Sequence, residues 1–128
     1  MFEVDKDELN LTEWLEQTQA KSDELAEFGK SHLPTDPGER HVDLDKAIQN
    51  ASDAARLLAD AESYLTQATA IAVFDIRRRY SDFSADERKL LVKEAVRQIH
   101  RLVDGLAVTH RTIQSRIFGS MNANRAGR

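Results

Sequence analysis

The sequence contains no cysteine, only two prolines and only five glycines among its 128 residues. Without cysteine there can be no disulfide, no cysteine-ligated zinc and no thiol nucleophile. Aromatic residues make up 6% of the chain, and no apolar run approaches the roughly 18 residues of a membrane span. The acidic start MFEVDKDELN is unlike a secretory signal. These absences predict a cytoplasmic protein without a membrane segment.

Abundant alanine, leucine, glutamate and arginine favour helices over sheets. The length suits one helical domain over residues 1–128, with flexible ends at 1–9 and 120–128. The net charge of −4 hides an uneven distribution, because residues 1–64 carry a net −10 and residues 65–128 a net +6. Such polarity indicates either a basic surface for a polyanion or mutual attraction between the halves or between subunits.

Apolar residues at steps of three and four predict a first helix from about Leu11 to Ser31, with Trp14 as a core anchor. The segment HLPTDPGERHV then breaks the pattern. A second helix is expected from Asp43, as its N-cap, to Tyr80. Its apolar stripe has a repeat typical of a coiled coil and comprises Leu44, Ile48, Ala51, Ala55, Leu58, Leu65, Ala72 and Ile76.

Ser84 and Glu87 form the pattern of a capping box, which predicts a third helix from about Ala85. Its stripe comprises Leu91, Ala95, Ile99, Leu102, Leu106, Ile113 and Ile117. Gly105 interrupts this helix and is expected to mark a close-packing point or a slight kink. The predicted fold class is all-α: two long antiparallel helices form a helical hairpin, and the shorter N-terminal helix packs alongside. Apolar positions outside the stripes favour a homo-oligomer.

Three arginines, Arg77, Arg78 and Arg79, stand in a row at the end of the second helix. Arginine binds phosphates bidentately, and Tyr80 and Phe83 beside them supply the aromatic surfaces that single-strand-binding proteins use. In the alternative interpretation, the arginines complement the helix macrodipole and pair with Asp75, Asp82 or Asp86. A second basic stretch lies on the third helix and comprises Arg97, Arg101, Arg111 and Arg116. Its alternative role is to match the acidic half of the chain, within or between subunits.

The sequence offers no sign of catalysis, a cofactor or a metal. The four histidines lack the spacing of a ligand pair. His110 and Ser115 are five residues apart, which does not form a nucleophile–base pair on a helix. There is no glycine-rich phosphate loop either. We therefore expect that the chain is not an enzyme.

The capped long helix DLDKAIQNASDAARLLADAESYLTQATAIAVFDIRRRYSD and the final HRTIQSRIFGSMNANRAG resemble the layout of UvsY-type recombination mediators of T-even-like phages. The resemblance implies an oligomeric accessory protein that binds single-stranded DNA and loads a recombinase onto DNA coated by single-strand-binding protein, in the host cytoplasm. It implies DNA binding by Arg77, Arg78 and Arg79, running into Tyr80 and Ser81. It also assigns oligomerisation to the final helix, at Ile99, Leu102, Leu106, Ile113 and Ile117.

A second hypothesis stays open: a helical interaction or assembly module, such as a phage structural protein, adaptor or inhibitor, that binds no nucleic acid. Whether the basic side chains face solvent or the carboxylates of a neighbour distinguishes the two hypotheses.

Overall fold

The computed structural model describes residues 4–126, with side chains over 11–122. This part of the chain contains no strand and has four helices, α1 (Val4–Lys30), α2 (Pro37–Arg79), α3 (Ala85–Ala95) and α4 (Arg97–Ala126). The predicted all-α fold class is therefore confirmed. Much of the ends expected to be flexible is helical, since 4–9 belong to α1 and 120–126 to α4. Residues 1–3 and 127–128 lie outside the described chain.

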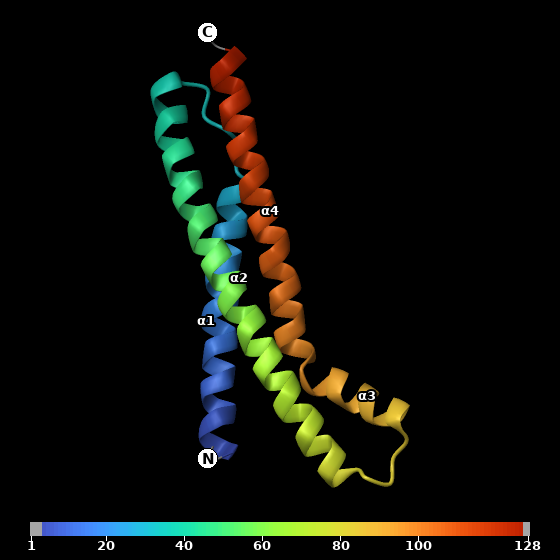
Figure 1. Ribbon diagram of the computed structural model, residues 1–128. Coiled ribbons are helices and arrows are strands. Elements are labelled where there is room, and N and C mark those ends of the chain that lie inside the picture. Colours follow the sequence, from blue (N-terminus) through green and yellow to red (C-terminus); the bar gives the residue numbers. More distant parts are fainter. Residues whose placement is uncertain (1–3, 127–128) are drawn as a thin grey trace.

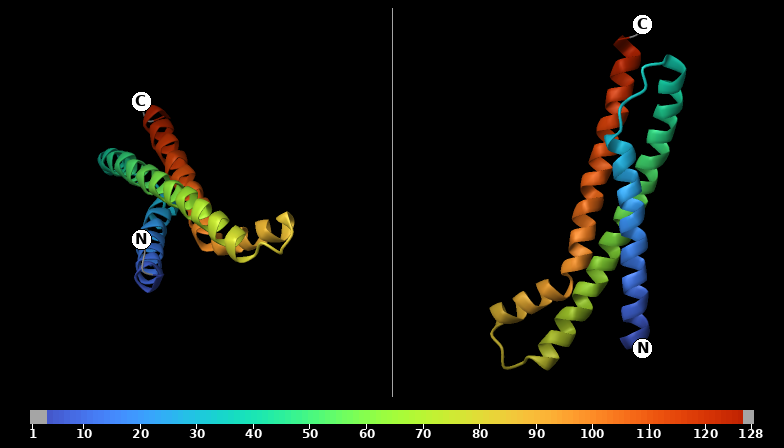
Figure 2. Two further views of the ribbon diagram at one scale, coloured as in Figure 1. Left: turned by 60° about the horizontal axis from the view of Figure 1, so that its bottom comes forward. Right: turned by 180° about the vertical axis from the view of Figure 1, so that it is seen from behind.

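Three of the helices share one long axis, and the fourth points away from it (Figure 1). α4 packs against both α2 and α1, whereas α1 and α2 contact each other less extensively. The N-terminus and the C-terminus lie at opposite ends of the molecule. Near the N-terminal end of this axis, α3 projects sideways and packs against the end of α2 (Figure 2).

The core is built on a line of alanines along α2. Ala47, Ala54 and Ala61 are completely buried and seven residues apart. The small side chain of Ala61 lets Leu102 and Leu106 of α4 approach α2 closely, and Ala54 packs with Leu25 of α1 and Ile113 of α4. The predicted stripe flanks this line. Six of its eight members are half-buried, and Ala51 and Leu58 pack against the core, whereas Ile48 and Ala55 are exposed. The line of small residues, one position earlier, is the one that two other helices cover.

The residues to which the resemblance assigned oligomerisation lie mostly inside this chain. Ile99, Leu102, Leu106 and Ile113 are buried, and Ile117 is half-buried. Ile113 packs with Leu25 of α1 and Ala54 of α2, for example. The assignment of the four buried residues to a contact between subunits is therefore corrected: they form the core of the monomer, and the chain's own helices cover them.

The start of α2 also differs from the expectation. The helix begins at Pro37, and the side chain of Asp36 is the N-cap, accepting a hydrogen bond from the Glu39 amide at 3.1 Å. Proline is favoured at the first position of a helix because its missing N–H would have no partner there. The prediction of Asp43 as N-cap is wrong; it lies inside the helix and is buried. Tyr80 is confirmed as the last position of the predicted helix, as its C-cap.

Asp43 instead forms a buried ion pair with Arg116 of α4. The guanidinium donates from Nη2 to Oδ1 at 2.7 Å and from Nε to Oδ2 at 3.1 Å. Arg116 also donates to the backbone carbonyls of Ser31 and His32, where α1 has just ended, and its guanidinium lies 4.6 Å from the ring centroid of Phe28. We call Asp43, Arg116 and these partners the clasp. It joins α1, the loop that follows it, α2 and α4.

The third predicted helix is divided in two. Its capping box is confirmed, with Ser84 accepting from the Glu87 amide at 3.1 Å. The helix then ends at Val96, whose φ of −106° and ψ of 9° leave the helical region, and α4 begins at the next residue. Gly105 does not mark a close approach, because no atom lies within 4 Å of the position a Cβ would occupy. The close contact is at Gly29 instead, where a Cβ would lie 3.0 Å from Thr112 Cγ2.

Asp43→Ala should lower the free energy of unfolding by about 3–5 kcal/mol, because it leaves the Arg116 charge buried without its counter-ion. Urea unfolding followed by circular dichroism measures this loss. Glu94→Ala is the control: it breaks an ion pair with Arg97 in which both side chains are exposed, and should cost about 0.5 kcal/mol or less. The double variant Asp43→Leu with Arg116→Met should recover much of the loss. Equal losses for Asp43→Ala and Glu94→Ala would contradict this account.

Gly29 and Gly105, each inside a helix, should respond differently to replacement by alanine. Gly105→Ala should raise the free energy of unfolding by up to about 1 kcal/mol, since it adds helix propensity in open space. Gly29→Ala gains the same propensity, but its Cβ must displace Thr112, so its net change should be clearly less favourable. Thermal and urea unfolding of both variants provide the comparison, and an equal gain at both positions would show that the packing at Gly29 is loose.

Candidate nucleic-acid interface

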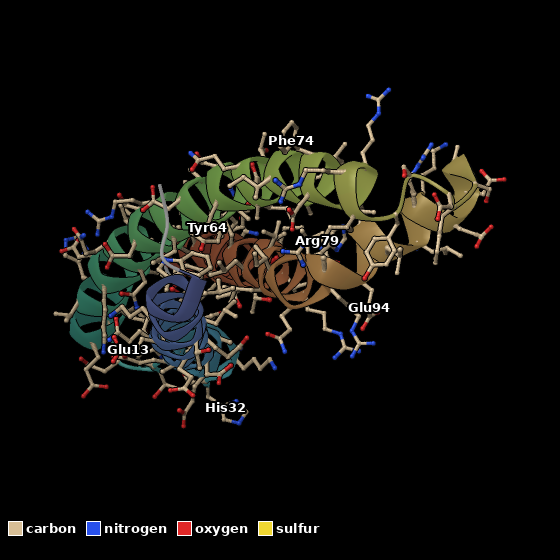
Figure 3. The ribbon with its side chains drawn as sticks, turned by 90° about the horizontal axis from the view of Figure 1, so that it is seen from below. Glu13, His32, Tyr64, Phe74, Arg79 and Glu94 are labelled. Carbon is tan, nitrogen blue, oxygen red and sulfur yellow. The ribbon has the colours of Figure 1, made fainter. Side chains whose placement is uncertain are left out.

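The candidate site lies on a part of the chain that has no core of its own. No residue from 62 to 95 is buried, whereas Ala61 and Val96 on either side are. We call residues 62–95 the arm; it contains the end of α2, the turn at 80–84 and α3. Its surface includes large apolar side chains: Phe74 is 70% exposed and Leu90 is 68% exposed. Phe74 points away from the other helices (Figure 3).

The three arginines at the end of α2 point in different directions. Arg77 lines a groove against α3, whereas Arg79 lies on the side of α2 that faces α4 (Figure 3). Consecutive helical residues are about 100° apart, which accounts for this divergence. The three guanidinium groups therefore do not form one cradle around a single phosphate. They can reach successive phosphates along a strand.

Two of the three arginines form the predicted ion pair with an aspartate. Asp75 Oδ1 accepts a hydrogen bond from Arg78 Nη2 at 3.0 Å, and Asp75 Oδ2 lies 3.6 Å from Arg79 Nε. Both guanidinium groups remain exposed, so these pairs hold the arginines only weakly. Arg77 has no ion-pair partner within the part of the chain that the structure describes. The pairings with Asp82 and Asp86 that the sequence also allowed do not occur there.

Two aromatic rings lie directly beside the arginines. The Tyr80 amide caps α2 by donating to the Ile76 carbonyl at 2.8 Å, and the Phe83 amide donates to the Tyr80 carbonyl at 3.1 Å. This turn brings the two ring centroids to 5.1 Å at an interplanar angle of 59°. Tyr80 is 38% exposed and Phe83 is 41% exposed. A base could stack on either ring while the neighbouring arginines hold its phosphates.

The basic stretch of α4 divides into an exposed face and one buried residue. Arg97, Arg101 and Arg111 lie on one face, and all three are exposed. Arg97 Nη1 lies 3.7 Å from Glu94 Oε1. Arg101 and Arg111 form no ion pair among residues 11–122. The assignment of Arg116 to this interface is wrong, because the clasp buries its guanidinium and uses it to bind Asp43.

The opposite charges of the two halves are hardly matched inside the molecule. Seven ion pairs occur among the described side chains, and six of them join residues only three or four apart. Five of these six lie within one helix, and the pair of Glu94 with Arg97 joins the end of α3 to the start of α4. Only the clasp joins the acidic half to the basic half. The net +6 of residues 65–128 is therefore left largely for solvent or for another molecule.

The described part of the chain supports neither a metal site nor a membrane-spanning helix. No group of three or more histidines and carboxylates over these residues could hold a metal ion. No helix in the same range is long and apolar enough to cross a membrane.

Trp14, expected in the core, packs against the cluster of Ala61, Leu102 and Leu106 and stacks on Tyr64 at 4.6 Å between ring centroids.

The sequence did not reveal the groove between α2 and α3 or the clasp. Both depend on contacts between distant residues, for which neither periodicity nor local charge gives a signal. The exposed Phe74 did have a signal, since it falls outside the apolar stripe of its helix.

Comparison of the chain with protein-family models, with curated proteins and with solved structures gives no match in any of the three.

Proposed function

We propose that this chain is a non-enzymatic, self-associating accessory protein that binds single-stranded nucleic acid through the arm and the adjoining face of α4. The observation that carries the proposal is the unmatched positive charge of the second half, which is exposed beside an accessible aromatic pair. The resemblance to UvsY-type mediators supports the same function. By this resemblance, the partners are single-stranded DNA, a recombinase and a single-strand-binding protein.

In the proposed complex, Arg77, Arg78 and Arg79 contact successive phosphates, and Tyr80 or Phe83 stacks on a base. Arg97 and Arg101, at the base of the arm, extend the track toward Arg111. Most of the affinity comes from the release of counter-ions, so binding is sensitive to salt and nearly independent of sequence. The negative net charge comes from the first half of the chain. Glu16 and Asp23 of that half line a groove together with Arg101, so carboxylates of α1 border the track there.

Self-association is the second element of the proposal. We view α2 and α4 as the two antiparallel members of a helical hairpin, with the arm at its tip. Phe74, Leu90 and Phe118 are each more than half exposed, and apolar surface of this kind favours burial against another copy. The core residues of α4 are unavailable for this contact, so outward-facing side chains would form it.

An assembly module without nucleic-acid binding is the other candidate function. It is favoured by the ion pairs of Asp75 with Arg78 and Arg79, and by the large apolar side chains of the arm. In such a module, the carboxylates of a neighbouring protein would cover the basic face.

Replacing Arg77, Arg78 and Arg79 together by glutamine should weaken binding of a labelled single-stranded oligonucleotide by about tenfold or more. It should also reduce the slope of log K against log salt by about 2, because three phosphate contacts to a single strand are lost. Fluorescence anisotropy at several salt concentrations measures both quantities.

The matched control changes the same number of charges in the acidic half: Lys21, Lys30 and Arg56, all exposed, are replaced by glutamine. This variant should retain most of the affinity. If both triple variants lose the same affinity, binding responds only to net charge and the site assignment is wrong. If the unmodified protein gives no salt-dependent signal, the assembly module is the better description.

Asp75→Asn should strengthen oligonucleotide binding by about threefold at low salt. The change frees two guanidinium groups from exposed pairs worth about 0.7 kcal/mol, and it removes a negative charge beside the phosphates. The same anisotropy titration measures the gain, which should shrink as salt is added. Asp53→Asn, which releases Arg56 on the acidic half, is the control. An unchanged or weaker affinity for Asp75→Asn would argue that Arg78 and Arg79 do not contact the strand.

A further inference from the structure

A groove of about 240 Å³ separates the end of α2 from α3. It is lined by four aliphatic side chains and three cations: Val73, Ile76, Ala85 and Val92 with Arg77, Arg88 and Lys89. No carboxylate and no aromatic ring belongs to this lining. The groove exists because α3 leaves the direction of α4 at Val96 and packs back against α2 on one side only.

The aliphatic floor of the groove is not covered by the rest of the chain. α3 has no buried residue. Val73 is exposed, and Ile76 and Val92 are only half-buried. Apolar side chains that face each other across an open groove gain free energy when another apolar group fills it.

The three cations lack counter-ions. Arg77, Arg88 and Lys89 form no ion pair with any side chain from 11 to 122. Arg88 donates from Nη1 to the Ser81 carbonyl at 3.3 Å, which ties α3 to the turn but leaves the charge of the guanidinium unbalanced. Three positive charges beside an apolar floor are complementary to a ligand that presents carboxylates next to apolar side chains.

We infer that this groove binds an acidic amphipathic helix of a partner protein. In this mode of recognition, apolar side chains at steps of three and four enter the groove, and carboxylates on the flanks of the helix pair with the cations. A nucleic-acid strand fits less well. Its phosphates would contact the cations, but its bases need a flat aromatic surface, and Tyr80 and Phe83 lie in the turn, outside the lining.

The inference does not rest on the proposed function, although Arg77 belongs to both sites. Lys89 and Val92 line only the groove, whereas Tyr80 and Phe83 belong only to the proposed nucleic-acid site. Variants at these two pairs of positions therefore test the two sites separately.

The test uses the full chain and a fluorescein-labelled helical peptide of about 18 residues, with leucines along one face and glutamates on the others. A scrambled peptide of the same composition has no apolar face and should bind about tenfold more weakly or not at all. Val92→Asp and Lys89→Glu should each weaken binding of the amphipathic peptide by about tenfold. Val108→Asp is the matched control for Val92→Asp, because Val108 is an exposed valine of α4 that does not line the groove. It should leave the affinity unchanged.

Circular dichroism of each variant verifies that the helical content is retained. Equal binding of the two peptides would overturn the inference, since attraction between charges alone would explain it. An equal effect of Val108→Asp and Val92→Asp would also overturn it. If Val92→Asp abolishes oligonucleotide binding while the peptide does not bind at all, the groove belongs to the nucleic-acid track instead. Tyr80→Ala with Phe83→Ala should weaken only the oligonucleotide, so a failure of the proposed function remains distinguishable.

Discussion

The clasp is the constraint on which the arrangement of the helices depends. A buried guanidinium requires a counter-ion and a hydrogen-bond acceptor for each of its donors. Arg116 obtains them from Asp43 of α2 and from the carbonyls of Ser31 and His32, which follow α1. A shift of α4 by one residue along α2 would separate these partners. The pair therefore specifies the register of α4 against α2 and fixes where the loop after α1 lies. Beyond Ala61 no comparable interaction holds α2, and the arm begins there.

Local signals in the sequence predicted the helices well. The steps of three and four residues located α1 and α2, and the capping box located the start of α3. Two positions of the predicted α2 stripe were wrong, Ile48 and Ala55. Hydrophobicity ranks Ile48 above Ala47, whereas close packing of three helices selects the smaller side chain. The end of α3 at Val96 contains neither proline nor glycine, so no local rule marks it. The clasp joins residues 73 positions apart, and nothing in the neighbourhood of either residue indicates the other.

In the candidate site, helix geometry accounts for several contacts that the sequence analysis did not derive. Arg111 and Arg116 are chemically identical, yet one faces solvent and the other is buried. Five helical positions correspond to about 140° of rotation, so the two could not share a face, and helix geometry alone would have separated them. The divergence of Arg77, Arg78 and Arg79 also follows from this geometry. The same geometry explains why Asp75 binds Arg78 and Arg79, three and four residues further on, and not Arg77, which is two residues further on.

The contrast between the body and the arm bears on how ligands act. In the body, apolar burial and the clasp stabilise the helices. No side chain of the arm is buried. Its helices are therefore stabilised by helix propensity, by the Ser84 cap and by contacts on one side only. Such a segment contributes only the smaller part of the total free energy of folding, and the body contributes the larger part. A ligand that fills the groove or contacts the arginines would therefore change the order of the arm more than that of the body. The unmatched charges and exposed apolar groups gather where the chain is least stabilised by its own core, so a partner can supply there the contacts that the fold lacks.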